Sequence, residues 1–417
     1  MFSIVSIGCT HHKQQKHEQL PLIKAYKKVI EEVTARKAAV LTHTGDTSVY
    51  SYLSPDAQDT ETRCLTMPVA EKGLWQLRID GNHDKTGASL NESTVNSRYQ
   101  YYVDNDKWKK LMYMGDYELR VIDVDGQKLQ VLPLPYPPRH AFAATGDVKD
   151  NREILGAASR FVQDMLKKGV EKSDPGIPLL ILYHGTVGAG NLKLGDENVF
   201  MCGEDVVVPL SMFPQRDNCA VITSHIHRPQ VLRERAPFVC VTGSLIHHTI
   251  DQASHDCGFY HTQFNGTMWE WEFVPVDVVR LKKITVDLAK YQDVPPEVAA
   301  EMLVKEIPHN ENNVFGITIV KPAVSTAVVS EKKIYDALVK QGVVVQSIKI
   351  EEEGQPTITE TDQRVAHDMG LGVRDHVGAY IDSKPEIAAI LQEAGVTKED
   401  VLAAADEVEC TMVEDVA

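Results

Sequence analysis

Short apolar runs alternate with helix-like segments from residue 1 to about residue 270. Runs rich in Val, Ile and Leu between polar or glycine-containing loops are typical of buried strands. The strand candidates are Ser3–Ile7, Ala38–Thr42, Trp75–Ile79, Leu179–Tyr183, Ala220–Thr223 and Phe238–Val241. The pattern predicts helices near 20–36, 95–112 and 150–168, and a hairpin over 118–133 that turns at Asp125-Gly126. We therefore predict an α/β domain over residues 1–275.

A second unit follows at residues 276–352. Its strands are expected at Leu281–Val286, Val314–Val320 and Val343–Ile350, with helices at 295–306 and 331–341 between them. This β-α-β-α-β order predicts a small, separate α/β domain.

Residues 353–417 are predicted to form an acidic linker and two amphipathic helices, near 384–395 and 398–409. The chain carries a net charge of −16, and residues 351–417 hold −13 of it, with 17 acidic and four basic side chains. The acidity of the tail therefore does not argue against nucleic-acid binding by the rest of the chain. The helices suit a surface that docks a partner, but they equally suit a solvated tail that packs on its own domain, because periodicity does not identify what an apolar stripe contacts.

The composition indicates the cellular compartment in which the protein is expected. The seven cysteines form no Cys-x-x-Cys pair, which favours a reducing, cytoplasmic compartment over a disulfide scaffold. No apolar run approaches the roughly 18 residues of a membrane span, and the first 20 residues lack the pattern of a signal peptide. We expect no membrane association.

Side chains that can bind metals follow five of the predicted strands. They are Cys9 and His11, then Asp46, then Asn82 and His83, then His184, and finally His225 and His227. Functional groups in α/β sheets gather at the carboxyl ends of strands, so these five loops are expected to converge. A single histidine after a strand is more often structural, but the ordered set together is a strong signal for a metal centre.

The donor types indicate two divalent metals. Imidazole and carboxylate donors favour Mn, Fe or Zn over Ca or Mg. Asp46 can bridge two ions through its two oxygens, and the alternation of an extended chain points His225 and His227 to one side. His83 directly follows Asn82, so we expect it to act as a general acid or phosphate contact, oriented by Asp84.

The ordered motifs resemble the calcineurin-like metallophosphoesterase superfamily. They read Cys9-Thr-His11, Gly45-Asp46, Gly81-Asn82-His83-Asp84, His184 and Ser224-His225-Ile-His227. Within that superfamily, the stretches at 224–260 and 131–138 look like the SbcD-type DNA-repair exonuclease subunit, and residues 276–352 look like its capping domain. The resemblance covers about residues 1–350.

The resemblance implies a four-layer α-β-β-α fold and a manganese-dependent DNA nuclease. Such a protein would form a homodimer and work with an SbcC-type coiled-coil ATPase bound through the C-terminal helices. One metal would be held by Cys9, His11, Asp46 and His227. The other would be held by Asp46, Asn82, His184 and His225. His83 matches the catalytic histidine, with Asp84 beside it.

The chain departs from the family pattern at several positions. Cys9 replaces the family's first aspartate. It is either a softer ligand that favours Zn or Fe over Mn or a small buried residue in a weakened metal site. Val49 stands where a second acid is common, and Ser224 replaces a glycine. The nearby His12, His43, His247 and His248 are expected to be outer neighbours of the site, with His247 and His248 also possible substrate contacts.

Contacts to DNA are poorly marked in the sequence. The patch Lys107-Trp108-Lys109-Lys110 is either a phosphate-binding patch or, as we favour, a solvated helix face with one packed Trp.

The sequence leaves three hypotheses about function. The first is a DNA exonuclease or endonuclease that works with an ATPase. The second is a phosphodiesterase for small nucleotides or phosphoproteins. The third, motivated by Cys9, is a catalytically weakened scaffold that binds DNA ends.

Overall fold

The computed structural model describes most of residues 2–276 and parts of the rest. The described ranges are 2–13, 19–50, 52–84, 108–138, 140–143, 151–193, 205–248, 255–276, 280–287, 313–321, 344–352 and 397–402, with residues 99, 252, 302, 332, 335, 336 and 391.

Two six-stranded sheets form the main body. The first has the order β14-β13-β1-β2-β3-β4, with β1 at Phe2–Ile7, β2 at Val40–His43, β3 at Trp75–Arg78, β4 at Leu111–Tyr113, β13 at Gly258–Phe264 and β14 at Trp269–Pro275. The second has the order β11-β12-β10-β7-β6-β5, with β5 at Arg120–Val124, β6 at Gln127–Leu134, β7 at Leu179–His184, β10 at Cys219–Ser224, β11 at Gln230–Arg233 and β12 at Phe238–Val241. Strands β1 to β4 run parallel, as do β6, β7, β10 and β12, so each sheet has a parallel part in which all carboxyl ends meet at one edge.

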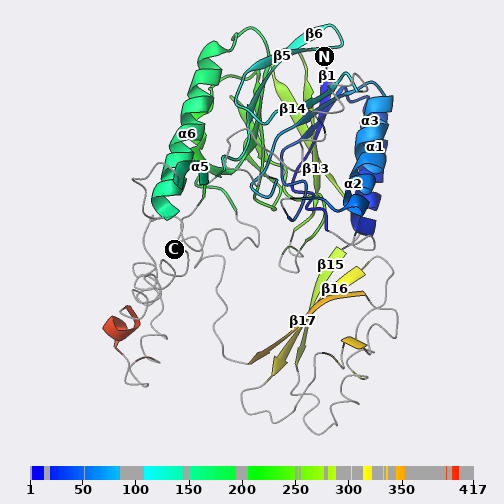
Figure 1. The fold of residues 1–417 in the computed structure, drawn as a ribbon, viewed down its shortest axis with the longest axis vertical. Coiled ribbons are helices and arrows are strands. Elements are labelled where there is room, and N and C mark those ends of the chain that lie inside the picture. Colours follow the sequence, from blue (N-terminus) through cyan, green and yellow to red (C-terminus); the bar gives the residue numbers. More distant parts are fainter. Residues whose placement is uncertain are drawn as a thin grey trace.

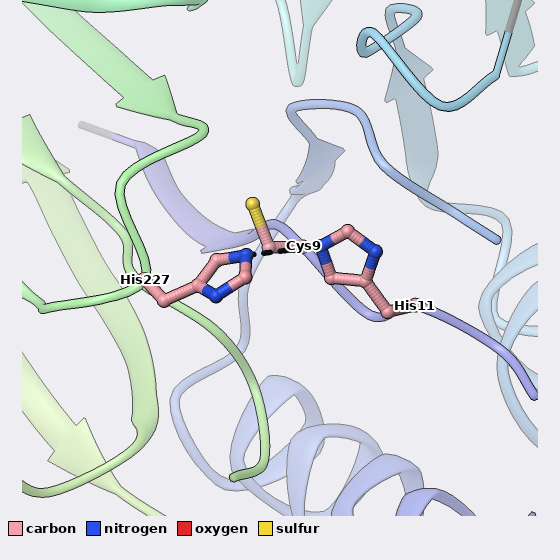
Figure 2. A group of neighbouring side chains, drawn as sticks. All are labelled: Cys9, His11 and His227. Carbon is pink, nitrogen blue, oxygen red and sulfur yellow. Dashed lines mark hydrogen bonds between the residues drawn. The ribbon is translucent and has the colours of Figure 1, made fainter. Parts of the chain in front are cut away.

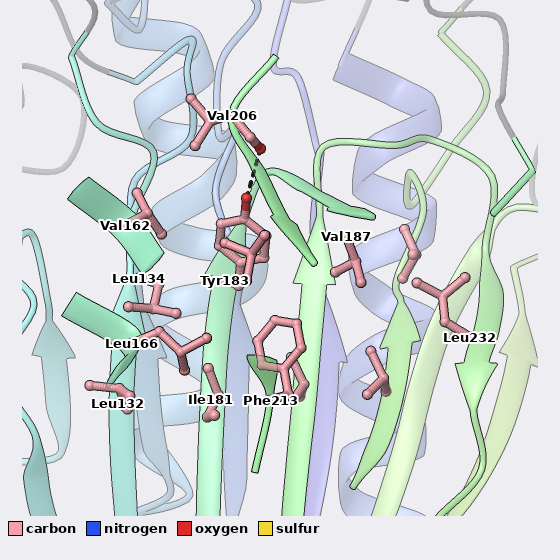
Figure 3. Packing of buried hydrophobic residues seen from close by; sticks show 14 of the residues in the cluster. Leu132, Leu134, Val162, Leu166, Ile181, Tyr183, Val187, Val206, Phe213 and Leu232 are labelled. Carbon is pink, nitrogen blue, oxygen red and sulfur yellow. Dashed lines mark hydrogen bonds between the residues drawn. The ribbon is translucent and has the colours of Figure 1, made fainter. Parts of the chain in front are cut away.

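The sheets pack face to face because alternate side chains of a strand point to opposite faces. In β7, Leu180 and Leu182 join a core between the sheets that also holds Ile4 and Val40 of the first sheet. The alternate residues Leu179, Ile181 and Tyr183 lie in a second core on the outer face. Figure 3 shows Ile181 and Tyr183 within it.

Helices cover both outer faces. Helix α6 (Asn151–Lys172) supplies Leu155, Val162 and Leu166 to the core outside the second sheet. Helix α1 (Leu20–Ala35) buries Tyr26 and Val29 against the first sheet. The two helical layers lie on opposite sides of the sheets (Figure 1). The expected four-layer α-β-β-α arrangement is confirmed.

Most predicted elements are found within a residue or two of their expected bounds. Strands β11, β13 and β14 were not predicted, and α6 extends to Lys172, beyond the predicted end at 168. Further exceptions lie between residues 52 and 113. We did not predict the continuous helical stretch of α2 (Pro55–Glu61), a π-turn (Thr62–Thr66) and α3 (Met67–Glu71). The predicted helix at 95–112 is wrong at its end, because Trp108–Lys110 lead into β4, whose pairing with β3 extends the sheet. Shorter elements are β8 (Thr186–Gly188), β9 (Val207–Pro209), a 3-10 turn (Leu210–Met212) and α5 (His140–Ala143).

The second unit forms its own parallel sheet. Strands β15 (Arg280–Asp287), β16 (Asn313–Lys321) and β17 (Val344–Glu352) pair in that order, as the sequence predicts. Of the helices expected between them, only residues 302, 332, 335 and 336 are described, and all four are helical. The domain boundaries stay a prediction.

The described part of the tail begins one of the two expected helices. Thr397 and Asp400 exchange hydrogen bonds, the Thr397 hydroxyl accepting from the Asp400 N–H at 3.1 Å and the Asp400 carboxylate accepting from the Thr397 N–H at 2.8 Å. This reciprocal cap fixes the start of the helix at Lys398. The helix near 384–395 lies outside the described residues except for Leu391. None of the helices that the structure describes is long and apolar enough to cross a membrane.

Candidate metal centre

The loops that follow β1, β2, β3, β7 and β10 meet where the carboxyl ends of the two sheets come together. Backbone hydrogen bonds join the first two loops, with the N–H of Cys9 donating to Gly45 O at 3.0 Å and that of His11 to Asp46 O at 3.0 Å. The structure brings together all the candidate ligands. Their donor atoms form three groups, Cys9/His11/His227, His11/Asp46/His83 and Asp46/His184/His225, and within each group they lie within 4.8 Å of one another.

One half of the centre is built around Asn82. Its amide oxygen lies 3.1 Å from His184 Nε2 and 3.0 Å from His225 Nδ1. His184 Nε2 is also 3.3 Å from Asp46 Oδ2. Two imidazole nitrogens, an amide oxygen and a carboxylate oxygen therefore converge on one point.

The other half contains Cys9, His11 and His227. The Nε2 atoms of the two histidines face each other at 3.0 Å, and the Cys9 sulfur lies beside them (Figure 2). The sulfur also accepts a hydrogen bond from the His225 N–H at 3.2 Å. This geometry is compatible with either interpretation of Cys9, as a ligand or as a buried structural residue.

Asp46 belongs to both halves. Its Oδ2 atom is 3.3 Å from His184 Nε2 and 3.6 Å from His11 Nε2. Its Oδ1 atom accepts the backbone N–H of His83 at 3.0 Å. A buried carboxylate in this position can bridge two cations.

The protonation states suit cation binding, because metals bind ionised carboxylates and neutral imidazoles. Burial alone would raise the pKa of Asp46, but His184 and His11 beside it hold that pKa well below its usual range. Burial lowers the pKa of His11 to about 4 and that of His227 well below its usual value. At neutral pH the centre therefore offers the ionised Asp46 carboxylate and the neutral rings of His11 and His227.

The backbone is strained at the candidate ligands. Seven described residues other than glycine have a positive φ, and four of them are Cys9, His11, Asp46 and His225, with φ of 45°, 43°, 55° and 110°. Such conformations cost roughly 1–3 kcal/mol each and cluster at functional sites. Their concentration here is independent of side-chain chemistry and supports a functional centre.

Two glycines allow the loops to approach. A Cβ on Gly81 would overlap the carboxylate and the backbone nitrogen of Asp46. Gly45 has φ +99°, and a Cβ there would lie 2.5 Å from His184 Nδ1. The glycines of the Gly-Asp and Gly-Asn-His-Asp motifs are thus required by close packing around Asp46.

Residues behind the ligands orient their rings. His225 Nε2 lies 3.2 Å from Asp205 Oδ2, and Asp205 in turn accepts from the Thr186 hydroxyl. His184 Nδ1 is 2.7 Å from Thr44 O and 3.0 Å from the Ser224 hydroxyl. The sequence analysis missed Asp205, because it follows no predicted strand.

Gln252 completes these contacts on the other side of the centre. Its side-chain amide is 2.7 Å from His227 Nδ1. It was also missed, since a glutamine is rarely itself a metal ligand. The only sequence signal that could have found it is its place within the 224–260 stretch.

His83 lies half-buried at the centre, in contact with His11 at a ring-centroid distance of 5.1 Å. Its Nδ1 atom is 2.8 Å from Val49 O.

The expectation that Asp84 orients the ring of His83 needs correction. The Asp84 carboxylate instead accepts the N–H groups of Thr47 and Gly81, at 2.9 and 2.8 Å, and ties these two loops together. Burial raises the pKa of Asp84 to about 8, with Asp46 adding to the effect.

The neighbouring histidines behave mainly as outer residues. His12 contacts Gln19 and Tyr26 at 2.8 Å each, and His43 contacts the Thr10 hydroxyl at 3.1 Å. His248 Nε2 binds Cys9 O at 3.0 Å and its ring lies 4.9 Å from that of His11, whereas His247 binds His255 O. His248 is thus closer to the centre than His247.

The basic patch is remote from this centre. Trp108–Lys110 precede β4, which runs parallel to β3, whereas Asn82 and His83 follow the other end of β3. Lys109 and Lys110 are exposed. The patch lies in a turn at the opposite edge of the sheet, so the expected helix face is wrong there; Lys107 lies outside the described residues.

No family model and no curated protein matches the sequence. Three similar solved structures illustrate the likeness of fold. GAP50, the anchor in the inner membrane complex of Plasmodium, has 11% identity and a TM-score of 0.40, over 66% of this chain and 84% of that one. A dimetal phosphatase from Danio rerio has 12% identity and a TM-score of 0.36, over 66% and 96%. The purple acid phosphatase PPD1 from yellow lupin has 11% identity and a TM-score of 0.35, over 66% and 51%. At these values the likeness carries no argument about substrate, metal or partner.

Proposed function

We propose that this protein is a phosphoesterase that depends on two divalent metal ions. The observation that carries the proposal is the position of Asp46, whose carboxylate lies between Asn82, His184 and His225 on one side and Cys9, His11 and His227 on the other. Two divalent ions held by these residues would supply Lewis-acid polarisation of a phosphoester.

The donor set fits transition metals. The half around Asn82 offers two nitrogens and two oxygens, which suits manganese. The half around Cys9 offers sulfur and two nitrogens, which favours zinc or iron if the sulfur binds. Manganese remains our first choice, with zinc or iron as alternatives.

We assign proton transfer to His83. A carbonyl only accepts hydrogen bonds, so the contact with Val49 O places a proton on His83 Nδ1. The Nε2 atom of the half-buried ring can donate a proton to a phosphoryl oxygen or to a leaving group when the ring is an imidazolium, in which both nitrogens carry protons. Asp84 supports this step only indirectly, through the two loops that it joins.

The proposed substrate is DNA. The order of the motifs, the 224–260 stretch, the separate small sheet and the acidic tail support an SbcD-type nuclease that acts in DNA end processing with an SbcC-type ATPase, as a homodimer. Cys9 supports one alternative, a weakened centre in a scaffold that binds DNA ends. A phosphodiesterase for small nucleotides or phosphoproteins shares the same metal chemistry.

The test compares wild type with His83→Asn in the presence of Mn²⁺. We expect wild type to cleave linear or hairpin DNA, and a chromogenic phosphodiester more slowly. General acid catalysis contributes about 10²–10⁴-fold, so kcat for DNA should fall by that factor in His83→Asn while the metal content stays the same. Exposed Asp217→Asn is the matched control. Absence of hydrolysis of either substrate by wild type, under Mn²⁺, Zn²⁺ or Fe²⁺, rules the enzyme out.

A further inference from the structure

Two exposed tyrosines stand beside the candidate centre. Tyr50 and Tyr52 are 53% and 59% exposed, the highest values among the aromatic side chains that the structure describes. Their rings are stacked, with centroids 5.9 Å apart and planes inclined by 20°. Isolated apolar side chains on a surface are ordinary, but a stacked aromatic pair presents a continuous π-surface.

The pair sits on the loop that holds His83. Val49, whose carbonyl binds His83 Nδ1 at 2.8 Å, directly precedes Tyr50. His83 itself groups with His11 and Asp46. A surface one residue away from this contact lies close to where a reacting phosphate would bind.

Hydrogen bonds fix the conformation of the chain around Tyr50 and Tyr52. The buried Ser48 hydroxyl donates to Tyr52 O at 2.8 Å and accepts from the Tyr50 N–H at 3.3 Å. The Val49 N–H donates to His12 O at 3.2 Å, and the N–H of His12 donates to Thr47 O at 2.8 Å. Ser54 then caps α2 by accepting from the Ala57 N–H at 3.2 Å. The exposure of the tyrosines is therefore a property of an anchored turn.

We propose that Tyr50 and Tyr52 form a platform on which a nucleobase of the substrate stacks while the adjoining phosphodiester lies at the metal centre. The inference rests on the proposed function, and it deepens that function by selecting substrates that carry bases over phosphoproteins. Every base has a π-face, so stacking binds nucleotides without reading sequence. The base of a nucleotide is joined to its phosphate through a single sugar, and Tyr50 directly follows Val49, whose carbonyl contacts His83.

The test measures the affinity of the metal-loaded full chain for a short single-stranded oligonucleotide and for an abasic oligonucleotide of equal length and charge. The His83→Asn background slows turnover during the measurement. Stacking on an aromatic side chain contributes about 5-fold to 100-fold in affinity per base. We expect Tyr50→Leu/Tyr52→Leu to lose that factor for the base-containing oligonucleotide and to bind the abasic one less than twofold more weakly.

Two controls separate stacking from other effects. Tyr50→Phe/Tyr52→Phe keeps both rings and should retain the affinity. Tyr335→Leu removes an exposed tyrosine elsewhere, 46% exposed, and should change nothing. A mononucleotide titrated alongside the oligonucleotide distinguishes free nucleotides from nucleic acid as the natural source of the base.

The proposal is overturned if the Leu variant binds both oligonucleotides equally well or loses affinity for both equally. It is also overturned if sedimentation shows that the Leu variant turns a dimer into a monomer, since the tyrosines would then contact a second copy of the chain. Hydrolysis of a chromogenic phosphodiester by wild type tests the metal centre separately. The platform can thus fail while the phosphoesterase stands, and base-dependent binding can persist where hydrolysis is absent.

Discussion

At the scale of single residues, the contact between Asp205 and His225 holds one ring of the centre. The 3.2 Å distance to His225 Nε2 leaves Nδ1 facing Asn82. A carboxylate behind a histidine fixes the ring and its tautomer, and loss of such a partner lowers metal affinity about 10–100-fold. We predict a loss of that size for Asp205→Asn, measured by competition with a metal-sensitive dye.

The matched control is Asp217→Asn, because Asp217 is exposed on the same chain segment. Asp217→Asn should bind metal like wild type. If Asp205→Asn also binds like wild type, then the ring of His225 is held by its other contacts and Asp205 has no part in the centre.

If the Cys9 sulfur binds metal, it sets the metal preference of its half of the centre. Thiolate sulfur favours zinc, whereas carboxylate oxygen favours manganese. We expect Cys9→Asp to shift the metals bound from an equimolar mixture of Zn²⁺ and Mn²⁺ towards manganese, as measured by elemental analysis. An unchanged ratio would mean that the sulfur is not a ligand and that Cys9 is a buried structural residue, whose sulfur accepts the hydrogen bond from the His225 N–H.

At the scale of elements, the strands and their polar ends could be predicted from sequence. The buried strands β1, β7 and β10 are mostly apolar runs, and β1, β2, β3, β7 and β10 each carry their candidate ligands within a few residues of the carboxyl end. Parallel pairing then brings those ends to a common edge, which is why local patterns sufficed to assemble a site from five distant segments.

Other elements depend on tertiary contacts that a local pattern does not contain. Strand β4 has only three residues, and it forms because β3 offers an unpaired edge. Asp205 and Gln252 approach the centre from loops, so neither apolar periodicity nor a motif marks them. The orientation of His83 by Val49 involves a backbone carbonyl, which every residue possesses.

The turn after β3 packs tightly against Asp46. An alanine at Gly81 would press its Cβ into Asp46. We predict that Gly81→Ala destabilises the fold by about 1–3 kcal/mol, the usual cost of overpacking, and reduces the bound metal. Chemical denaturation and elemental analysis measure the two effects. Gly190→Ala is the control, because a Cβ there meets nothing within 4 Å. Wild-type stability and metal content in Gly81→Ala would contradict the packing argument.

At the scale of the whole molecule, charge is divided unevenly along the chain. Residues 353–417 carry 15 acidic and four basic side chains, so they hold −11 of the net charge of −16. The rest of the chain is therefore much closer to neutral than the complete protein. If the substrate is DNA, as we propose, this acidic tail repels it electrostatically unless a partner covers or neutralises the tail.

This repulsion leads to a prediction about salt. Removal of residues 353–417 should raise the affinity for DNA at low ionic strength, because a long-range repulsion is lost. The gain should vanish as salt increases, since the Debye length shrinks from about 30 Å at 0.01 M to about 3 Å at 1 M. Fluorescence anisotropy with labelled DNA over that range measures both effects, and hydrolysis of a chromogenic phosphodiester verifies that the shortened chain keeps its metal centre. A difference between the two chains that persists unchanged at 1 M salt would mean that the tail acts through direct contact with the DNA-binding surface, and equal affinities at low salt would mean that the tail does not oppose DNA at all.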